Sequence, residues 1–151
     1  MLKKELLAKA MKYCAYQERC HEEVRTKLLE LGGRGEDLEQ VMSELIEQNF
    51  LNEERFAMAF ARGKFRIKKW GIVKIKQELK LRKISDYCIK KALTEIEDDV
   101  YIQTIQELIA KKNNLLKEKN IYIRKNKIAT FIIGKGFEPA VVWEAVNKKI
   151  T

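Results

Sequence analysis

The chain has 151 residues, of which 46% are hydrophobic and 35% charged, with one proline and seven glycines. This composition excludes a disordered chain and predicts a mostly helical protein of one domain or one array. The net charge is +9, lysines interrupt the apolar positions of MLKKELLAKA, and no apolar run approaches the roughly 20 residues that span a bilayer, so we expect a cytoplasmic protein without a membrane segment.

The first 50 residues predict three helices, of which the first is LKKELLAKAMKYCAYQ. Breaks are expected near residues 17–20 and 32–36. The third helix carries apolar residues at i, i+3, i+4 and i+7, which line one face of a helix. These residues are Leu38, Val41, Met42 and Leu45.

Residues 51–97 predict a second group of three helices, beginning with EERFAMAFARGKFRIKKW. Asn52 is a preferred N-cap, and Glu53 and Glu54 complement the positive end of the helix dipole, so the helix is expected to begin here. Further breaks are expected near residues 49–52, 70, 84–86 and 97–99. The buried stripe of this helix is predicted at Phe56, Phe60, Gly63 and Ile67.

Charge is segregated along the chain. Residues 36–54 hold seven acids and no base, whereas residues 62–83 hold ten bases and one acid. The basic segment is either a solvated face or a contact surface for a polyanion, and the shortage of i,i+4 acidic partners favours the contact surface. The acidic segment is a candidate for fixing the orientation of the same partner. The residues predicted to bind a partner or nucleic acid are Arg55, Arg62, Arg66, Lys68, Lys69, Lys74, Lys76, Lys80 and Lys83.

The last third begins with the helix DVYIQTIQELIAKKNNLL, with breaks near residues 118–121 and 134–138, and Pro139 suits the first turn of the last helix. Residues 24–42 align without gaps on residues 75–93 and again on residues 128–146. The five matched apolar columns are Val24/Ile75/Ile128, Leu28/Leu79/Ile132, Leu38/Ile89/Val142, Val41/Ala92/Ala145 and Met42/Leu93/Val146. A glycine column, Gly32 and Gly136, is interrupted by Lys83.

These repeats predict the fold class: all-α, as an elongated, curved array of three tandem three-helix repeats. The repeats are expected at residues 1–50, 51–97 and 98–151. Because each unit leaves apolar surface open at its ends, neighbouring units should stack and form a concave binding side.

Four segments together resemble the RecX family, regulators of the bacterial RecA recombinase. They are RCHEEVRTKL (19–28), LNEERFA (51–57), GIVKIKQELKLRKI (71–84) and GKGF (134–137). The motif positions within them are Asn52, Phe56, Ala57, Gly71, Ile75, Leu79, Gly136 and Phe137. Three residues depart from the pattern: Glu53 replaces an aspartate, Cys20 a capping serine and Lys83 a glycine.

The resemblance implies a protein that binds RecA filaments on single-stranded DNA and mainly inhibits the recombinase ATPase and strand exchange in DNA repair and recombination. The resemblance implies that the protein is not an enzyme and needs no cofactor. A weak direct contact with DNA and a monomeric state are also expected.

A catalytic or metal-binding function has little support in the sequence. His21, the single histidine, has Cys20, Glu22 and Glu23 beside it, but no further histidine or regular cysteine spacing converges on them, so neither catalysis nor a metal site is predicted. Cys14 and Cys88 are expected in the core, and Cys20 is expected to be accessible.

The alternative to a filament regulator is a direct DNA-binding protein that acts without RecA. Paired short helices and basic rows suit phosphate contacts. Trp70 and Tyr122 lie beside basic residues, where they could stack on bases or pack in the core.

Overall fold

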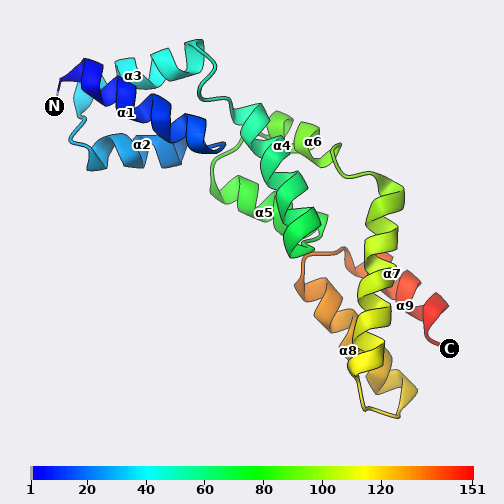
Figure 1. Ribbon diagram of the computed structural model, residues 1–151. Helices are drawn as coiled ribbons and strands as arrows, with labels where there is room; N and C mark the ends of the chain where they lie inside the picture. Colours follow the sequence, from blue (N-terminus) through cyan, green and yellow to red (C-terminus); the bar gives the residue numbers. More distant parts are fainter. Residues whose placement is uncertain (1) are drawn as a thin grey trace. The chain divides into compact units, whose positions relative to one another are not determined.

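The computed structural model describes residues 2–151, and within them it contains helices and no strand (Figure 1). This confirms the all-α class, and the breaks between helices fall where the sequence predicts them. The elements are α1 (Lys3–Tyr16), α2 (His21–Glu30), α3 (Gly35–Glu47), α4 (Glu53–Gly63), the π-helical turn η1 (Lys64–Lys68), α5 (Ile72–Leu81), α6 (Asp86–Leu93), α7 (Asp98–Leu115), α8 (Ile121–Gly134) and α9 (Pro139–Lys149).

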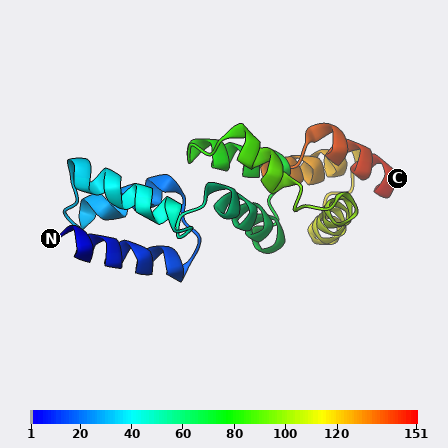
Figure 2. The same ribbon diagram turned by 90° about the horizontal axis from the view of Figure 1, so that it is seen from above.

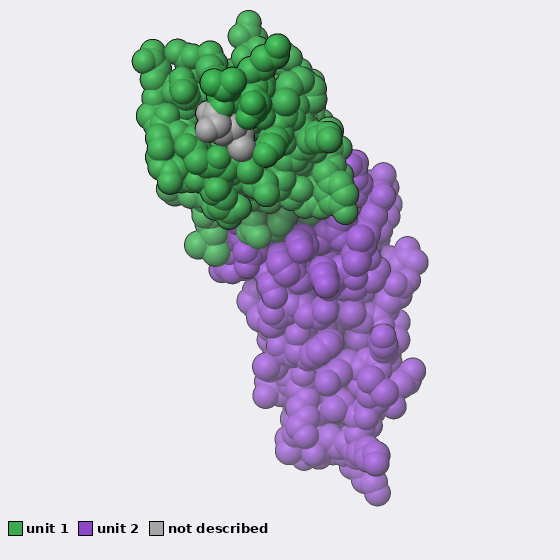
Figure 3. All heavy atoms as spheres, turned by 60° about the vertical axis from the view of Figure 1, so that its left-hand side comes forward, with its two compact units in different colours: residues 1–60, 79–92 green, residues 61–78, 93–151 purple. Residues whose placement is uncertain are grey.

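The chain divides into two compact units, which Figure 3 colours separately. The first comprises residues 1–60 and 79–92. Within it, α1, α2 and α3 pack against one another, as Figures 1 and 2 show from two directions. Their shared core holds Leu6, Ala10, Cys14, Val24, Leu28, Leu38, Val41, Met42, Leu45 and Leu51.

The second unit comprises residues 61–78 and 93–151. Here α7, α8 and α9 pack against one another around buried aliphatic side chains such as Ile105 and Ile128. Tyr101 lies between two buried phenylalanine rings, with ring centroids 5.8 Å from Phe65 and 5.2 Å from Phe137. The division of the chain into repeats at residues 50 and 97 stays a prediction.

The repeated apolar columns are core positions. The columns of Val24, Leu28 and Leu38 are buried in all three copies, which confirms the periodic pattern. In the other two columns Ala145 and Leu93 are half-buried. The first column is therefore the same inward helix face in α2, α5 and α8, and the repeat seen in the sequence is a repeat of packing.

The end of the α4 segment differs from the prediction. Ile67 was expected on the buried stripe but is 78% exposed, whereas Phe65 is 5% exposed. The reason is η1: a π-helical turn winds more residues per turn than an α-helix, so the inward face shifts away from the 3.6-residue spacing. Lys69 then ends the segment with φ 57°, in the left-handed region.

The three cysteines are free thiols and all are buried. Cys14 and Cys88 are core residues, as expected. Cys20 is 1% exposed, so the prediction that it is accessible was wrong. Its backbone N–H donates to the Glu23 carboxylate at 3.2 Å, which holds it at the start of α2 and turns its side chain into the core.

Candidate nucleic-acid and partner interface

Six of the predicted binding residues belong to the second unit and form what we call the η1–α5 basic surface. They are Arg62, Arg66, Lys68, Lys69, Lys74 and Lys76. All except the half-buried Lys74 are exposed. Arg62 lies 3.8 Å from the Glu95 carboxylate. Arg66, Lys68, Lys69 and Lys76 form no ion pair with any of the described residues, so their charges face solvent uncompensated.

Trp70 organises part of this surface. Its half-buried ring has the Lys74 ammonium 4.4 Å and the Lys64 ammonium 5.0 Å from the ring centroid. Cation–π attraction thus holds two lysines beside the turn between η1 and α5. Trp70 uses its ring to position cations within its own unit. Lys64 was not among the predicted binding residues.

The remaining predicted binding residues, Arg55, Lys80 and Lys83, belong to the first unit. The Arg55 guanidinium is 2.6 Å from the Glu18 carboxylate and also donates to the carbonyls of Asn49 and Phe50. These contacts of Arg55 are therefore all with residues of the first unit. Lys83 forms an exposed ion pair with Glu22 at 3.2 Å, and Lys80 is exposed. These three candidates thus belong to a different unit from the η1–α5 basic surface.

The motif segments GIVK and GKGF meet in the second unit. The Gly71 N–H donates to the Lys135 carbonyl and the Val73 N–H to the Gly136 carbonyl, both at 2.9 Å. A Cβ added at Gly71 would lie 2.3 Å from the backbone of Gly136. The two glycines therefore allow the beginning of α5 to contact the α8–α9 turn. We call this contact between Gly71 and Gly136 the glycine joint, and the two hydrogen bonds fix its register.

Tyr101 completes the joint from α7. Its hydroxyl accepts from the Ile72 N–H at 3.1 Å and donates to the Glu138 carboxylate. Burial, and then the hydrogen bond to Glu138, raise the pKa of Tyr101, so the phenol stays protonated as this donor. Sequence reasoning missed Tyr101 and Glu138, since no motif marks either residue.

The other motif residues are caps and core. Asn52 is the N-cap of α4, because its side-chain oxygen accepts from the Arg55 N–H at 2.8 Å. The remaining motif side chains are buried: Phe56, Ala57, Ile75, Leu79 and Phe137. These residues shape the repeats and contribute no exposed chemistry.

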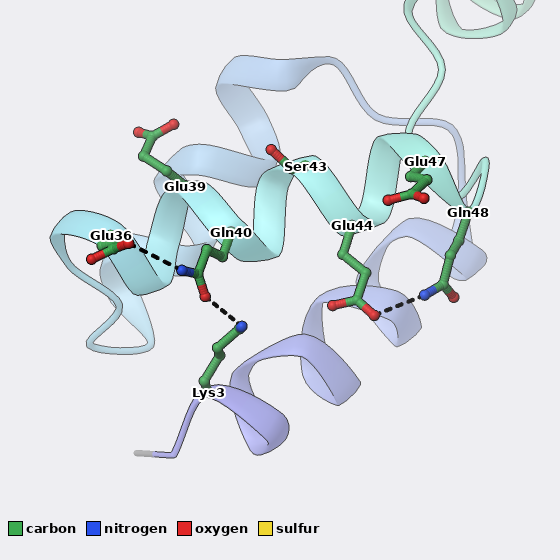
Figure 4. A pocket seen from close by; sticks show the side chains of 8 residues that line it. All are labelled: Lys3, Glu36, Glu39, Gln40, Ser43, Glu44, Glu47 and Gln48. Carbon is green, nitrogen blue, oxygen red and sulfur yellow. Dashed lines mark hydrogen bonds between the residues drawn. The ribbon is translucent and has the colours of Figure 1, made fainter.

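The acidic segment forms a hollow on α3, shown in Figure 4. Several of its carboxylates already have partners in the chain. Glu39 forms a two-pronged pair with Arg25, which lowers the pKa of Glu39, and Gln40 donates to Glu36 at 3.3 Å and accepts from Lys3. The acidic face is thus partly neutralised, in contrast to the η1–α5 basic surface.

Neither a metal centre nor a transmembrane helix emerges from residues 2–151. No three histidine, cysteine, aspartate or glutamate side chains gather there in a way that would hold an ion. None of the described helices combines the length and apolar character needed to cross a bilayer.

The secondary structure of residues 2–151 consists of helices, and the same apolar core positions recur along the chain. The chain is therefore an all-α protein of helical repeats. Two sequence models match it: the RecX second three-helix domain at residues 52–93 and the RecX third three-helix domain at residues 99–146. The chain belongs to the RecX family.

Named relatives agree with this assignment. Regulatory protein RecX of Prosthecochloris aestuarii is 28% identical over 148 residues, covering 98% of the chain and 95% of that relative. Regulatory protein RecX of Halalkalibacterium halodurans is 29% identical over 136 residues, covering 90% of the chain and 51% of that relative. The chain thus spans almost all of the first relative and about half of the second, and a regulatory role of the RecX type follows.

The crystal structure of RecX from Lactobacillus salivarius has the same fold. It superimposes with a TM-score of 0.87 at 23% identity, covering 97% of the chain and 95% of that structure. Similarity at this identity establishes the fold and leaves the partner to be argued from the residues.

Proposed function

We propose that the chain binds RecA filaments on single-stranded DNA and regulates them, mainly by inhibiting ATP hydrolysis and strand exchange. Membership of the RecX family supports a regulatory role. The η1–α5 basic surface supports a partner that carries phosphate charge, because four of its exposed cations form no ion pair with the described residues.

The single observation that carries the proposal is the uncompensated charge of Arg66, Lys68, Lys69 and Lys76. A solvated face that served only stability would place acids at i,i+4 from these bases. A regulator of this kind acts by binding one conformation of the filament more tightly than another, which requires a surface of fixed geometry and no catalytic group.

The test is the single-stranded-DNA-dependent ATPase of the cognate RecA, titrated with the wild type and with the variant Arg66→Glu, Lys68→Glu, Lys76→Glu. The wild type is expected to suppress turnover at substoichiometric amounts, and the variant to lose at least tenfold in potency. The matched control is Lys4→Glu, Lys9→Glu, Lys12→Glu, which makes the same change in net charge on exposed positions of α1.

Equal loss in both variants would mean that net charge alone, rather than this surface, governs the interaction. If the wild type leaves turnover unchanged at concentrations that saturate bare DNA, the direct DNA-binding alternative replaces the filament regulator. Affinity in that case should fall steeply with salt and need no recombinase.

The acidic face of α3 is proposed to orient the chain on the filament. The double change Glu44→Lys, Glu47→Lys should then weaken ATPase inhibition without weakening binding to free single-stranded DNA. An equal effect in the two assays would argue against an orienting role.

A further inference from the structure

A second feature of the second unit lies between α8 and α9. It is a hollow of about 540 Å³, within the roughly 300–1,000 Å³ range of small-ligand sites. Its lining residues are Tyr122, Ile123, Lys125, Asn126, Trp143 and Asn147. Tyr122 is 80% exposed and Ile123 47%, while Trp143 is half-buried. Aromatic surface of this kind is left open to solvent here instead of being used in the core.

The backbone beneath the hollow is held firmly. The Asn120 side-chain oxygen accepts from the N–H groups of Tyr122 and Ile123 at 3.0 and 3.2 Å, which caps α8. The Arg124 guanidinium donates to the Asn113 side chain and carbonyl, both at 2.6 Å, and to the Leu116 and Glu118 carbonyls. The turn before α8 is therefore fixed, and Tyr122 stands on a rigid base that loses little entropy on binding.

The charge around the hollow is positive. Residues 117–127 hold five bases and one acid, and the lining contains no carboxylate. The nearest acids in the sequence have partners: Glu118 lies 3.8 Å from Lys127, and Glu144 lies 3.1 Å from Lys148. A ligand with negative charge is thus favoured over a neutral small molecule.

We propose that this hollow is a stacking site for unpaired bases of single-stranded nucleic acid. The Tyr122 and Trp143 rings offer faces for a base, Lys125 offers a cation for the adjoining phosphate, and the Asn126 and Asn147 amides can donate to and accept from any base edge. Stacking of this kind tolerates any sequence. The site does not depend on a recombinase, so it stands or falls separately from the filament function.

The test uses the Trp70→Phe chain, which leaves Trp143 as the single tryptophan. Its fluorescence is titrated with a thymine homo-oligodeoxynucleotide and with an abasic oligodeoxynucleotide of the same length and charge. Stacking should quench Trp143 with the thymine strand and not with the abasic strand. Equal responses to the two strands would overturn the proposal, because phosphate contacts alone would then explain binding.

Two tyrosine variants in the same background locate the effect. Tyr122→Ala should weaken binding to the thymine strand by on the order of 5- to 100-fold, from the cost of losing one stacked base. The matched control is Tyr87→Ala, which removes another exposed tyrosine (63%) from α6 in the first unit and should bind like the parent. Circular dichroism verifies the fold of each. Unchanged affinity in the Tyr122 variant would also overturn the proposal and leave the hollow as a candidate protein contact.

Discussion

The turn after α5 and the turn after α8 have the same backbone conformation but opposite requirements for a side chain. Lys83 has φ 60° and Gly136 has φ 99°, and Gly32 in the first repeat has φ 96°. The glycine column, which Lys83 interrupts in the sequence, thus has a positive φ in all three copies. Lys83 carries an exposed side chain, whereas a Cβ at Gly136 would lie 2.2 Å from the Lys74 Cβ.

The difference between Lys83 and Gly136 distinguishes two reasons why a turn can require glycine. At both turns a left-handed residue ends the preceding helix, and a non-glycine residue there costs free energy but is tolerated. At the α8–α9 turn the beginning of α5 also packs directly on the backbone, so no side chain fits.

Both tryptophans, Trp70 and Trp143, belong to the second unit. Their fluorescence therefore reports unfolding of the unit that contains the glycine joint.

Gly136→Ala should have the largest effect. Left-handed strain and the overlap with Lys74 together should lower the free energy of unfolding by about 2–5 kcal/mol. Urea denaturation followed by tryptophan fluorescence measures this change. Gly134→Ala is the matched control, because its Cβ would meet no atom within 4 Å and should be neutral or slightly stabilising. Equal midpoints for the two variants would contradict the joint.

Gly71→Ala should come next. Its φ is not in the left-handed region, so the expected loss of about 1–3 kcal/mol arises only from the collision with the backbone of Gly136 and Phe137. The double variant with Gly136→Ala should lose less than the sum of the single losses, since one displacement relieves both contacts. Strict additivity in the fluorescence-detected midpoints would show that the two glycines act independently.

Tyr101→Phe should cost about 1–2 kcal/mol, because the Ile72 N–H and the Glu138 carboxylate lose their partner while the ring packing is kept. The pKa of Tyr101 is raised in the fold, so the wild type loses stability as pH rises above the unfolded value of about 10. Denaturation at pH 8 and pH 11 should show a smaller alkaline loss in the variant. The same loss in both proteins would rule out a buried, hydrogen-bonded phenol.

Lys83→Gly should have the smallest effect and the opposite sign. Relief of the left-handed lysine should raise stability by about 0.5–1 kcal/mol, since the exposed pair with Glu22 contributes little. Far-UV circular dichroism is the appropriate probe, because Lys83 belongs to the first unit. Lys80→Gly, inside α5, is expected to destabilise by about 1 kcal/mol and serves as the control. Destabilisation by Lys83→Gly would show that its side chain contributes more than its backbone costs.

Local signals made much of this molecule predictable. The apolar spacing, the Asn52 cap and Pro139 are properties of short segments, so the helices, their breaks and the core columns of Val24, Leu28 and Leu38 followed from the sequence. The segregation of charge was equally readable, and it led to the candidate binding residues. Their role in binding stays a prediction, and three of them, Arg55, Lys80 and Lys83, belong to the first unit.

Only the tertiary structure decided the contacts between distant segments. Gly71 and Gly136 meet although they are 65 positions apart in the sequence, and a glycine in a sequence does not reveal what approaches it. The π-helical turn that buries Phe65 and exposes Ile67 is a small change in backbone winding. Lys83 adopts, at φ 60°, a left-handed conformation that glycine favours, although its own side chain disfavours it. Sequence patterns record which face of a helix is apolar, whereas the choice of partner for that face is made by the whole fold.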